Sequence, residues 1–130
     1  MKLLNILWLS TALLVTTSCN RYETHSLQVT ATAYNSVPWQ TKKIEPNVAA
    51  WDDTLKPGMK CIAVSRDLIP LGLTHRTKVK ISGLPGTYLV LDKMNKRYTK
   101  RIDLYMGTDI QAARDWGKRQ VTISWRTKKH

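Results

Sequence analysis

The chain has 130 residues, which leaves room for one domain and excludes an assembly of several. It carries 21 Lys and Arg against 9 Asp and Glu, a formal net charge of +12. Such a charge indicates an anionic partner, or a solvated basic face that only keeps the protein soluble.

The N-terminal segment predicts export. Met1 and Lys2 give a short positive start, and residues 3–15 form an apolar run that is too short to span a bilayer comfortably. Small residues then lead into Cys19, as in a bacterial lipoprotein signal. We expect residues 1–18 to be the signal peptide and Cys19 to carry the lipid; an ordinary cleaved signal and an uncleaved anchor are the alternatives.

Export narrows the choice of partner. Without residues 1–18 the chain keeps 20 basic and 9 acidic residues, a net of +11, because only Lys2 is lost. An exported protein has little access to nucleic acid, so we expect no nucleic-acid partner and favour the cell wall or lipid headgroups. An Asp directly after the lipidated Cys is an inner-membrane retention signal, and here that position is Asn20. We therefore favour an outer-membrane anchor that faces the periplasm.

The first half of the mature chain contains one predicted strand and one long connection. Residues 19–26 are polar and predict a tether, and residues 27–34 alternate apolar and polar as a strand does. Residues 35–56 show no periodicity and contain Trp39 and Trp51. Because long ordered loops usually carry function, this connection is a candidate wall of a cleft.

The second half predicts five more strands, at residues 61–64, 77–81, 87–92, 101–106 and 120–125, with a turn at 69–72. Thr108 and Gln111 have capping-box spacing, so a helix should follow and end near Trp116 and Gly117. Six short strands with one helix indicate a mainly β protein, a small six-stranded β-barrel over residues 27–125, followed by a basic tail at 126–130.

Cysteine and histidine point to neither a thiol catalyst nor a metal site. Cys61 lies in an apolar run and is either a small buried hydrophobe, if Cys19 is lipidated, or a disulfide partner of Cys19. The three histidines fit no metal-ligand spacing, so no metal is predicted.

Two aspartates are the main candidates for chemistry. Asp92 and Asp103 stand at the ends of one basic connection, and each follows an apolar residue in a predicted strand. The two strands could bring both carboxyl groups to one cleft, as acid/base chemistry on a sugar bond requires. Alternatively, Asp92 accepts backbone hydrogen bonds at a strand end, and Asp103 pairs with Arg101 or a turn amide.

Four stretches, read in order, resemble the 3D (three-aspartate) domain, which is related to the catalytic part of membrane-bound lytic transglycosylase A. They are residues 29–34 (VTATAY), 62–72 (IAVSRDLIPLG), 92 together with 102–105 (D…IDLY) and 112–117 (AARDWG). The resemblance covers residues 27–125. It implies a double-psi β-barrel and action on the glycan strands of peptidoglycan.

The resemblance also implies roles for particular residues. Asp92 is then the catalyst, which protonates the glycosidic oxygen and afterwards deprotonates the muramoyl hydroxyl that closes a 1,6-anhydro ring; Asp103 supports it. We expect Tyr34 and Trp51 to stack on sugar rings or, alternatively, to belong to the core. Ser65 and Arg101 complete the predicted substrate-binding set.

The chain departs from the family pattern at two places. Ser65 stands where the family has its first aspartate, and Met94 and Asn95 replace the glycines that commonly follow the second. A missing like charge and the basic residues at 93–101 both favour the ionised form of Asp92, whereas burial would oppose it. Asp67, two residues after Ser65, is expected to cap a turn before Pro70.

We therefore expect a peptidoglycan-active lytic transglycosylase, a monomer that uses no metal or organic cofactor. The alternative is a lipoprotein that binds peptidoglycan without cleaving it.

Overall fold

A computed structural model describes residues 20–37 and 47–130. The predicted signal peptide, the predicted lipidation site Cys19 and the loop residue Trp39 lie outside these residues. Within the described part, none of the helices has the length and apolarity needed to cross a membrane.

Six strands close into a barrel in the order β1-β5-β2-β4-β3-β6, which confirms the predicted mainly β, six-stranded barrel. The pairs β1–β5 and β2–β4 are parallel and the other four are antiparallel, a mixture consistent with a double-psi arrangement. The strands are β1 (Tyr22–Tyr34), β2 (Cys61–Val64), β3 (Lys78–Ile81), β4 (Tyr88–Lys93), β5 (Arg101–Tyr105) and β6 (Arg119–Lys128).

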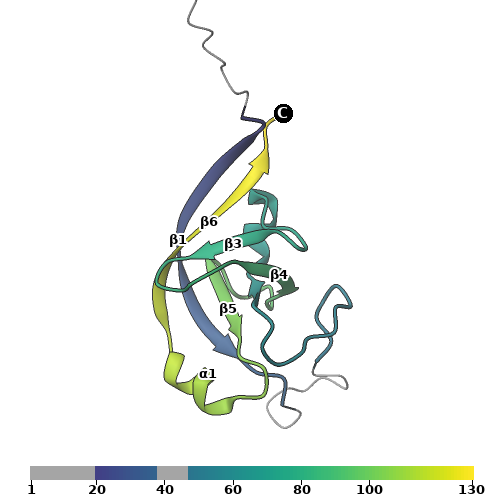
Figure 1. The fold of residues 1–130 in the computed structure, drawn as a ribbon, viewed down its shortest axis with the longest axis vertical. Coiled ribbons are helices and arrows are strands. Elements are labelled where there is room, and N and C mark those ends of the chain that lie inside the picture. The colour runs from purple at the N-terminus through teal and green to yellow at the C-terminus, as the bar shows by residue number, and fades with distance from the viewer. Residues whose placement is uncertain (1–19, 38–46) are drawn as a thin grey trace, which may run out of the picture.

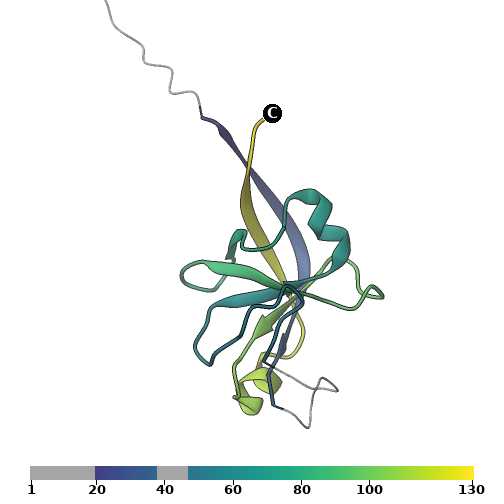
Figure 2. The same ribbon diagram turned by 90° about the vertical axis from the view of Figure 1, so that its right-hand side faces the viewer.

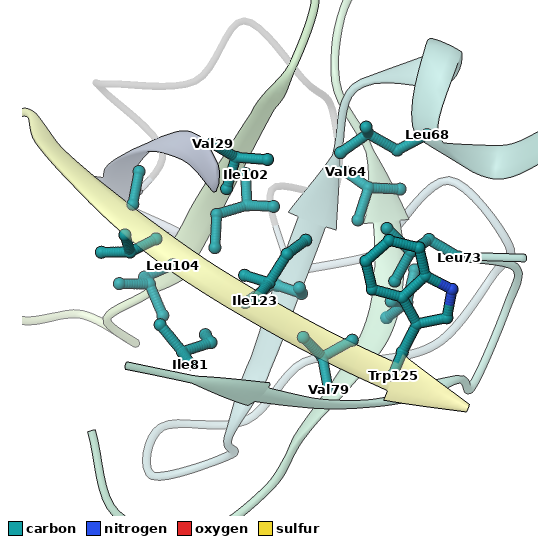
Figure 3. Packing of buried hydrophobic residues seen from close by; sticks show 14 residues of the cluster. Val29, Val64, Leu68, Leu73, Val79, Ile81, Ile102, Leu104, Ile123 and Trp125 are labelled. Atoms are coloured by element: carbon teal, nitrogen blue, oxygen red, sulfur yellow. The ribbon is translucent and has the colours of Figure 1, made fainter. Parts of the chain in front are cut away.

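The barrel interior is filled by alternate residues of the strands, as the period of two requires. Side chains from all six strands and from the segment after β2 meet there and are almost completely shielded from solvent (Figure 3). They include Val29, Ile62, Val64, Leu68, Leu73, Val79, Ile81, Val90, Ile102, Leu104, Ile123 and Trp125.

A second, smaller apolar cluster covers the outer face of β2, β4 and β5. Its buried members are Ala49, Leu55, Cys61, Leu91 and Tyr105. Residues 49 and 55 come from the long connection, where Val48 and Thr54 form an isolated antiparallel bridge. The connection therefore packs as a cover on this face, which explains why β2 is buried on both faces.

β1 and β6 run past the barrel as a two-stranded ribbon, so the described N-terminal end and the C-terminus lie together (Figures 1 and 2). Tyr22 pairs with Lys128 at the tip of this ribbon. The predicted tether at 19–26 and tail at 126–130 are therefore largely strand. The sequence pattern did not predict strand at these two ends, because a ribbon with solvent on both faces needs no alternation of apolar residues.

Two short helices differ from their predicted form. The α-helix α1 (Ile110–Trp116) ends where expected, but its N-cap is Asp109, whose side chain accepts from the Ala112 amide at 2.9 Å, and not Thr108. The predicted turn at 69–72 is part of a 3-10 helix, η2 (Arg66–Leu71). Asp67 does not cap it; its carboxylate accepts from the distant Lys100 amide at 2.9 Å.

Candidate functional site

The two aspartates lie on either side of one alanine. Ala63 of β2 is in register with Asp92 of β4 on one edge and with Asp103 of β5 on the other. Thr32 of β1 is in register with Asp103, so Asp92, Ala63, Asp103 and Thr32 form one row across four strands. Residues in register share a face of the sheet, and neighbouring strands lie about 4.8 Å apart, so the two aspartate backbones are about 10 Å apart across Ala63.

Asp92 is buried, with 5% of its surface exposed. Its Oδ1 accepts two backbone hydrogen bonds, from the Ala50 amide at 2.8 Å and from the Lys93 amide at 2.9 Å. The first of these ties the long connection to β4. Asp92 thus performs the structural role that was the alternative to catalysis, and both bonds suit a carboxylate, which can only accept.

Asp103 is partly exposed and more weakly held. Its Oδ1 accepts a hydrogen bond from the Thr32 hydroxyl at 3.0 Å, and the Arg101 Nε donates to the same hydroxyl at 3.3 Å, so Arg101 reaches the carboxylate through Thr32. Burial is the main cause that raises the pKa of Asp103 to about 6, and the charge of Asp92 adds to it. The Thr32 hydrogen bond and the Arg101 charge act in the opposite direction.

Ser65 lies below the surface beside this row. It is fully buried, and its hydroxyl accepts a hydrogen bond from the Arg101 amide at 3.0 Å. The Arg101 carbonyl in turn accepts from the Ser65 amide at 2.9 Å. Ser65 therefore joins the end of β2 to the start of β5, and a substrate could not touch it in this conformation.

Tyr34 belongs to the second apolar cluster. Its ring packs at a tilt on Tyr105, with centroids 5.5 Å apart, which favours the core alternative over an open sugar platform. Its hydroxyl is buried and has no hydrogen-bond partner among the described residues. Burial, followed by the charge of Asp92, raises the pKa of Tyr34, and Asp103 contributes in the same direction. Tyr34 therefore lies close to both acids.

Trp51 is held in the long connection by stacking. Its ring stacks on that of His75, with the two ring centroids 5.1 Å apart. Lys93, at the end of β4, has its Nζ 5.0 Å from the Trp51 ring centroid. The Asp53 carboxylate forms a hydrogen bond with His75 Nε2 and an ion pair with Arg76 at 3.5 Å. Sequence reasoning missed His75 and Asp53 because 22 residues separate them and neither lies in a recognisable motif.

The basic connection between the aspartates contains an aromatic ring that two cations contact. Arg97 and Arg101 lie over Tyr98, at 4.7 and 4.6 Å from the ring centroid. Arg101 thereby links Tyr98 to Thr32 and to the Asp103 side of the site. The arrangement places fixed positive charge beside the carboxyl group that has the raised pKa.

Cys61 is fully buried in the second cluster, and Cys19, its partner in the predicted alternative of a disulfide, lies outside the described residues. Burial, with the charges of Asp92 and Asp53, raises the pKa of Cys61 to about 12, so the thiolate needed for nucleophilic chemistry is disfavoured. Across residues 20–37 and 47–130, no three His, Cys, Asp or Glu side chains come together as metal ligands would.

Comparison with models of known protein families and with curated proteins finds no match to this chain.

Proposed function

We propose that the face formed by Asp92, Ala63 and Asp103 cleaves glycosidic bonds of the peptidoglycan glycan strand, as a lytic transglycosylase does. The observation that supports this most is the pair of acids with unequal surroundings. Asp103 is partly exposed with a pKa raised to about 6, and Asp92 is a buried acceptor of two amides. Pairs of acids with different environments are typical of acid/base sites.

The roles that this geometry favours reverse those expected from the family resemblance. In the proposal Asp103 donates the proton to the glycosidic oxygen, because a group with a pKa near 6 is still partly protonated close to neutral pH. Once ionised, the same carboxylate takes the proton of the sugar hydroxyl that closes the anhydro ring. Asp92 acts as the fixed charge that helps to raise the pKa of Asp103.

The basic connection supplies the polar contacts in this proposal. Arg101 presents positive charge next to Asp103, and Arg97 lies with it over the Tyr98 ring. A peptidoglycan strand carries lactyl and stem-peptide carboxylates, so this charge complements the substrate. Trp51, whose ring is already stacked on His75, forms the wall on the Asp92 side.

The alternative is a protein that binds peptidoglycan without cleaving it. It is favoured by the structural uses of two site residues: Asp92 holds the Ala50 amide, and Ser65 holds the Arg101 amide where the family has an aspartate. A site whose acids serve the fold could retain binding and lose catalysis.

One experiment separates the two. The full chain, in a nonionic detergent, is incubated with purified sacculi, and anhydromuropeptides are measured by mass spectrometry for wild type, Asp103→Asn, Asp92→Asn and Asp115→Asn. Asp115 is an exposed acid on α1 and is the matched control. We expect Asp103→Asn to lower release about 100-fold or more, and Asp115→Asn to leave it unchanged.

Other outcomes have definite meanings. Equal release by Asp103→Asn and wild type would exclude Asp103 as the acid. A loss with Asp92→Asn alone would restore the assignment that the resemblance implies. Pelleting with sacculi without release by any variant would leave the binding protein.

A further inference from the structure

The outer surface of β1, β6 and β3 contains a basic groove of about 630 Å³. Its charged lining consists of Arg76, Lys78, Lys80 and Arg126, and no acidic side chain of the described residues contributes to it. A second hollow of about 490 Å³ shares Lys80, Thr87 and Ser124 with the first, so the depression continues along β3.

The groove is formed largely by β1, β3 and β6, which carry neither aspartate. In the closed strand order, β6 is three strands away from β2 in either direction, so Ser124 and Ala63 are on opposite sides. Lys80 is in register with Ser124 of β6, and Ser124 is in register with Ser26 of β1. At one end the groove meets the candidate site, because Arg76 pairs with Asp53 and Asp53 bonds to His75, on which Trp51 stacks. The role of Lys78, Lys80 and Arg126 does not depend on the function proposed for Asp103.

Three of the four cations are available to a ligand. Arg76 already pairs with Asp53, whereas Lys78, Lys80 and Arg126 have no carboxylate within 4.0 Å in the described part of the chain. Lys78 and Lys80 alternate with buried residues along β3 and so project from one face, about 6.6 Å apart. Such a row matches an extended chain that carries repeated negative charges.

The groove also limits the class of that chain. Trp125 is only 4% exposed, so Tyr22, which is 41% exposed and has Arg126 at 4.9 Å from its ring centroid, is the one aromatic ring of the described lining that a base could reach. Single-stranded nucleic acid is usually held by stacking successive bases on several rings, which the described part of this groove does not provide. Hydroxyl groups of Thr24, Thr77, Thr87 and Ser124 line it instead and can bond to sugar hydroxyls. A concave groove also fits a strand better than the flat surface of a membrane.

We propose that this groove binds an anionic glycan strand through Lys78, Lys80 and Arg126. It would hold the protein on an acidic polysaccharide while the opposite face of the barrel stays free.

The test measures binding of the full chain, in a nonionic detergent, to fluorescein-labelled polygalacturonate, with dextran as the neutral glycan and oligo(dT) as the nucleic acid. The variants are Lys80→Gln/Arg126→Gln and a control pair of equal charge change outside the groove, Arg114→Gln/Lys118→Gln. Both control residues are exposed on or just after α1. Thermal denaturation checks that each variant folds.

We expect the groove pair to weaken polygalacturonate binding at least 10-fold and to flatten its salt dependence, while the control pair changes it less than twofold. Asp115→Asn, which changes an exposed acid on α1 outside the groove, should bind polygalacturonate within twofold of wild type. Equal weakening by both pairs would mean that only net charge acts, and would overturn the proposal. It would also be overturned if wild type failed to bind polygalacturonate, or if oligo(dT) bound more tightly through the same residues.

Discussion

At the scale of single residues, the surroundings of Asp103 determine how readily its carboxyl group holds a proton. Its neighbours Thr32 and Arg101 favour the ionised form, yet burial and the charge of Asp92 outweigh them and raise its pKa to about 6. The folded protein therefore favours the protonated form of Asp103 more than the unfolded chain does. This preference affects stability as well as any catalytic role.

We predict that Asp103→Asn removes a pH-dependent loss of stability. The pKa of Asp103 rises from 3.8 to about 6 on folding, so its favourable contribution is complete below about pH 4 and is lost as the pH rises through 6. At pH 7 the Asn variant should be more stable by about 2 kcal/mol, allowing for partial exposure, and near pH 4 the two should be similar. Urea denaturation at several pH values measures this difference.

The matched control is again Asp115→Asn on α1, whose stability should follow wild type at each pH. Parallel pH curves for wild type and Asp103→Asn would contradict the raised pKa.

Ser65→Asp should raise the pKa of Asp103 further. The serine hydroxyl bonds to the Arg101 amide on the strand that carries Asp103, so a carboxylate there adds a nearby like charge. Because the site is fully buried, we also expect a loss of about 1–3 kcal/mol of stability. A carboxyl-carbon NMR titration follows Asp103, and Ser65→Asn controls for size. A shift equal in the Asn and Asp variants would show that charge is not the cause.

At the scale of elements, the ends of η2 and β6 depend on close packing. Trp125 Nε1 donates to the Leu71 carbonyl at 3.0 Å, and a Cβ placed on Gly72 would lie 2.4 Å from Thr127 Cγ2. Gly72 also has φ +99°. The 3-10 helix lies beside the ribbon (Figure 2), and a C-cap without a side chain allows this approach with Thr127 in its present position.

Gly72→Ala should destabilise the protein by about 2–4 kcal/mol, since it adds a clash to backbone strain. Gly83 is the matched control, because it has φ +80° with nothing within 4 Å of an added Cβ. Gly83→Ala should cost only the strain, about 1 kcal/mol. Chemical denaturation gives both values, and equal losses would show that Thr127 simply moves aside.

At the scale of the whole molecule, charge opposes folding. The net charge is +12. Among the described residues, the basic partners in ion pairs are His25, His75 and Arg76, which pair with Glu23 or Asp53. Most cations therefore repel one another without a close partner, and the barrel and its two apolar clusters must outweigh that repulsion.

Salt should therefore stabilise this protein. Raising NaCl from about 20 to 200 mM shortens the screening length and should increase the free energy of unfolding by about 1 kcal/mol. Urea denaturation at the two salt concentrations measures it, and Lys80→Gln/Arg126→Gln, which removes two positive charges, should show a smaller gain. A decrease with salt would mean that attractive pairs dominate.

Much of the barrel was predictable because its strands obey simple patterning. Residues 61–64 form a strand with the predicted bounds, and β3, β4 and β5 begin or end within one residue of expectation. Alternation identifies such strands because one face must be buried. The ribbon ends at 22–26 and 126–128 were missed, since they bury little and are specified by their pairing with each other.

The sequence identified the two aspartates of the candidate site but not the surroundings of each carboxyl group. The sequence by itself determined a cationic, mainly β chain with two aspartates on strands that follow each other in the chain. Only the tertiary structure decided that Asp92 is buried against the Ala50 amide, that Asp103 lies beside Thr32, and that the basic groove forms on β1, β3 and β6, which carry neither aspartate. Burial and strand register depend on residues far apart in the chain, and they set which carboxyl group holds a proton.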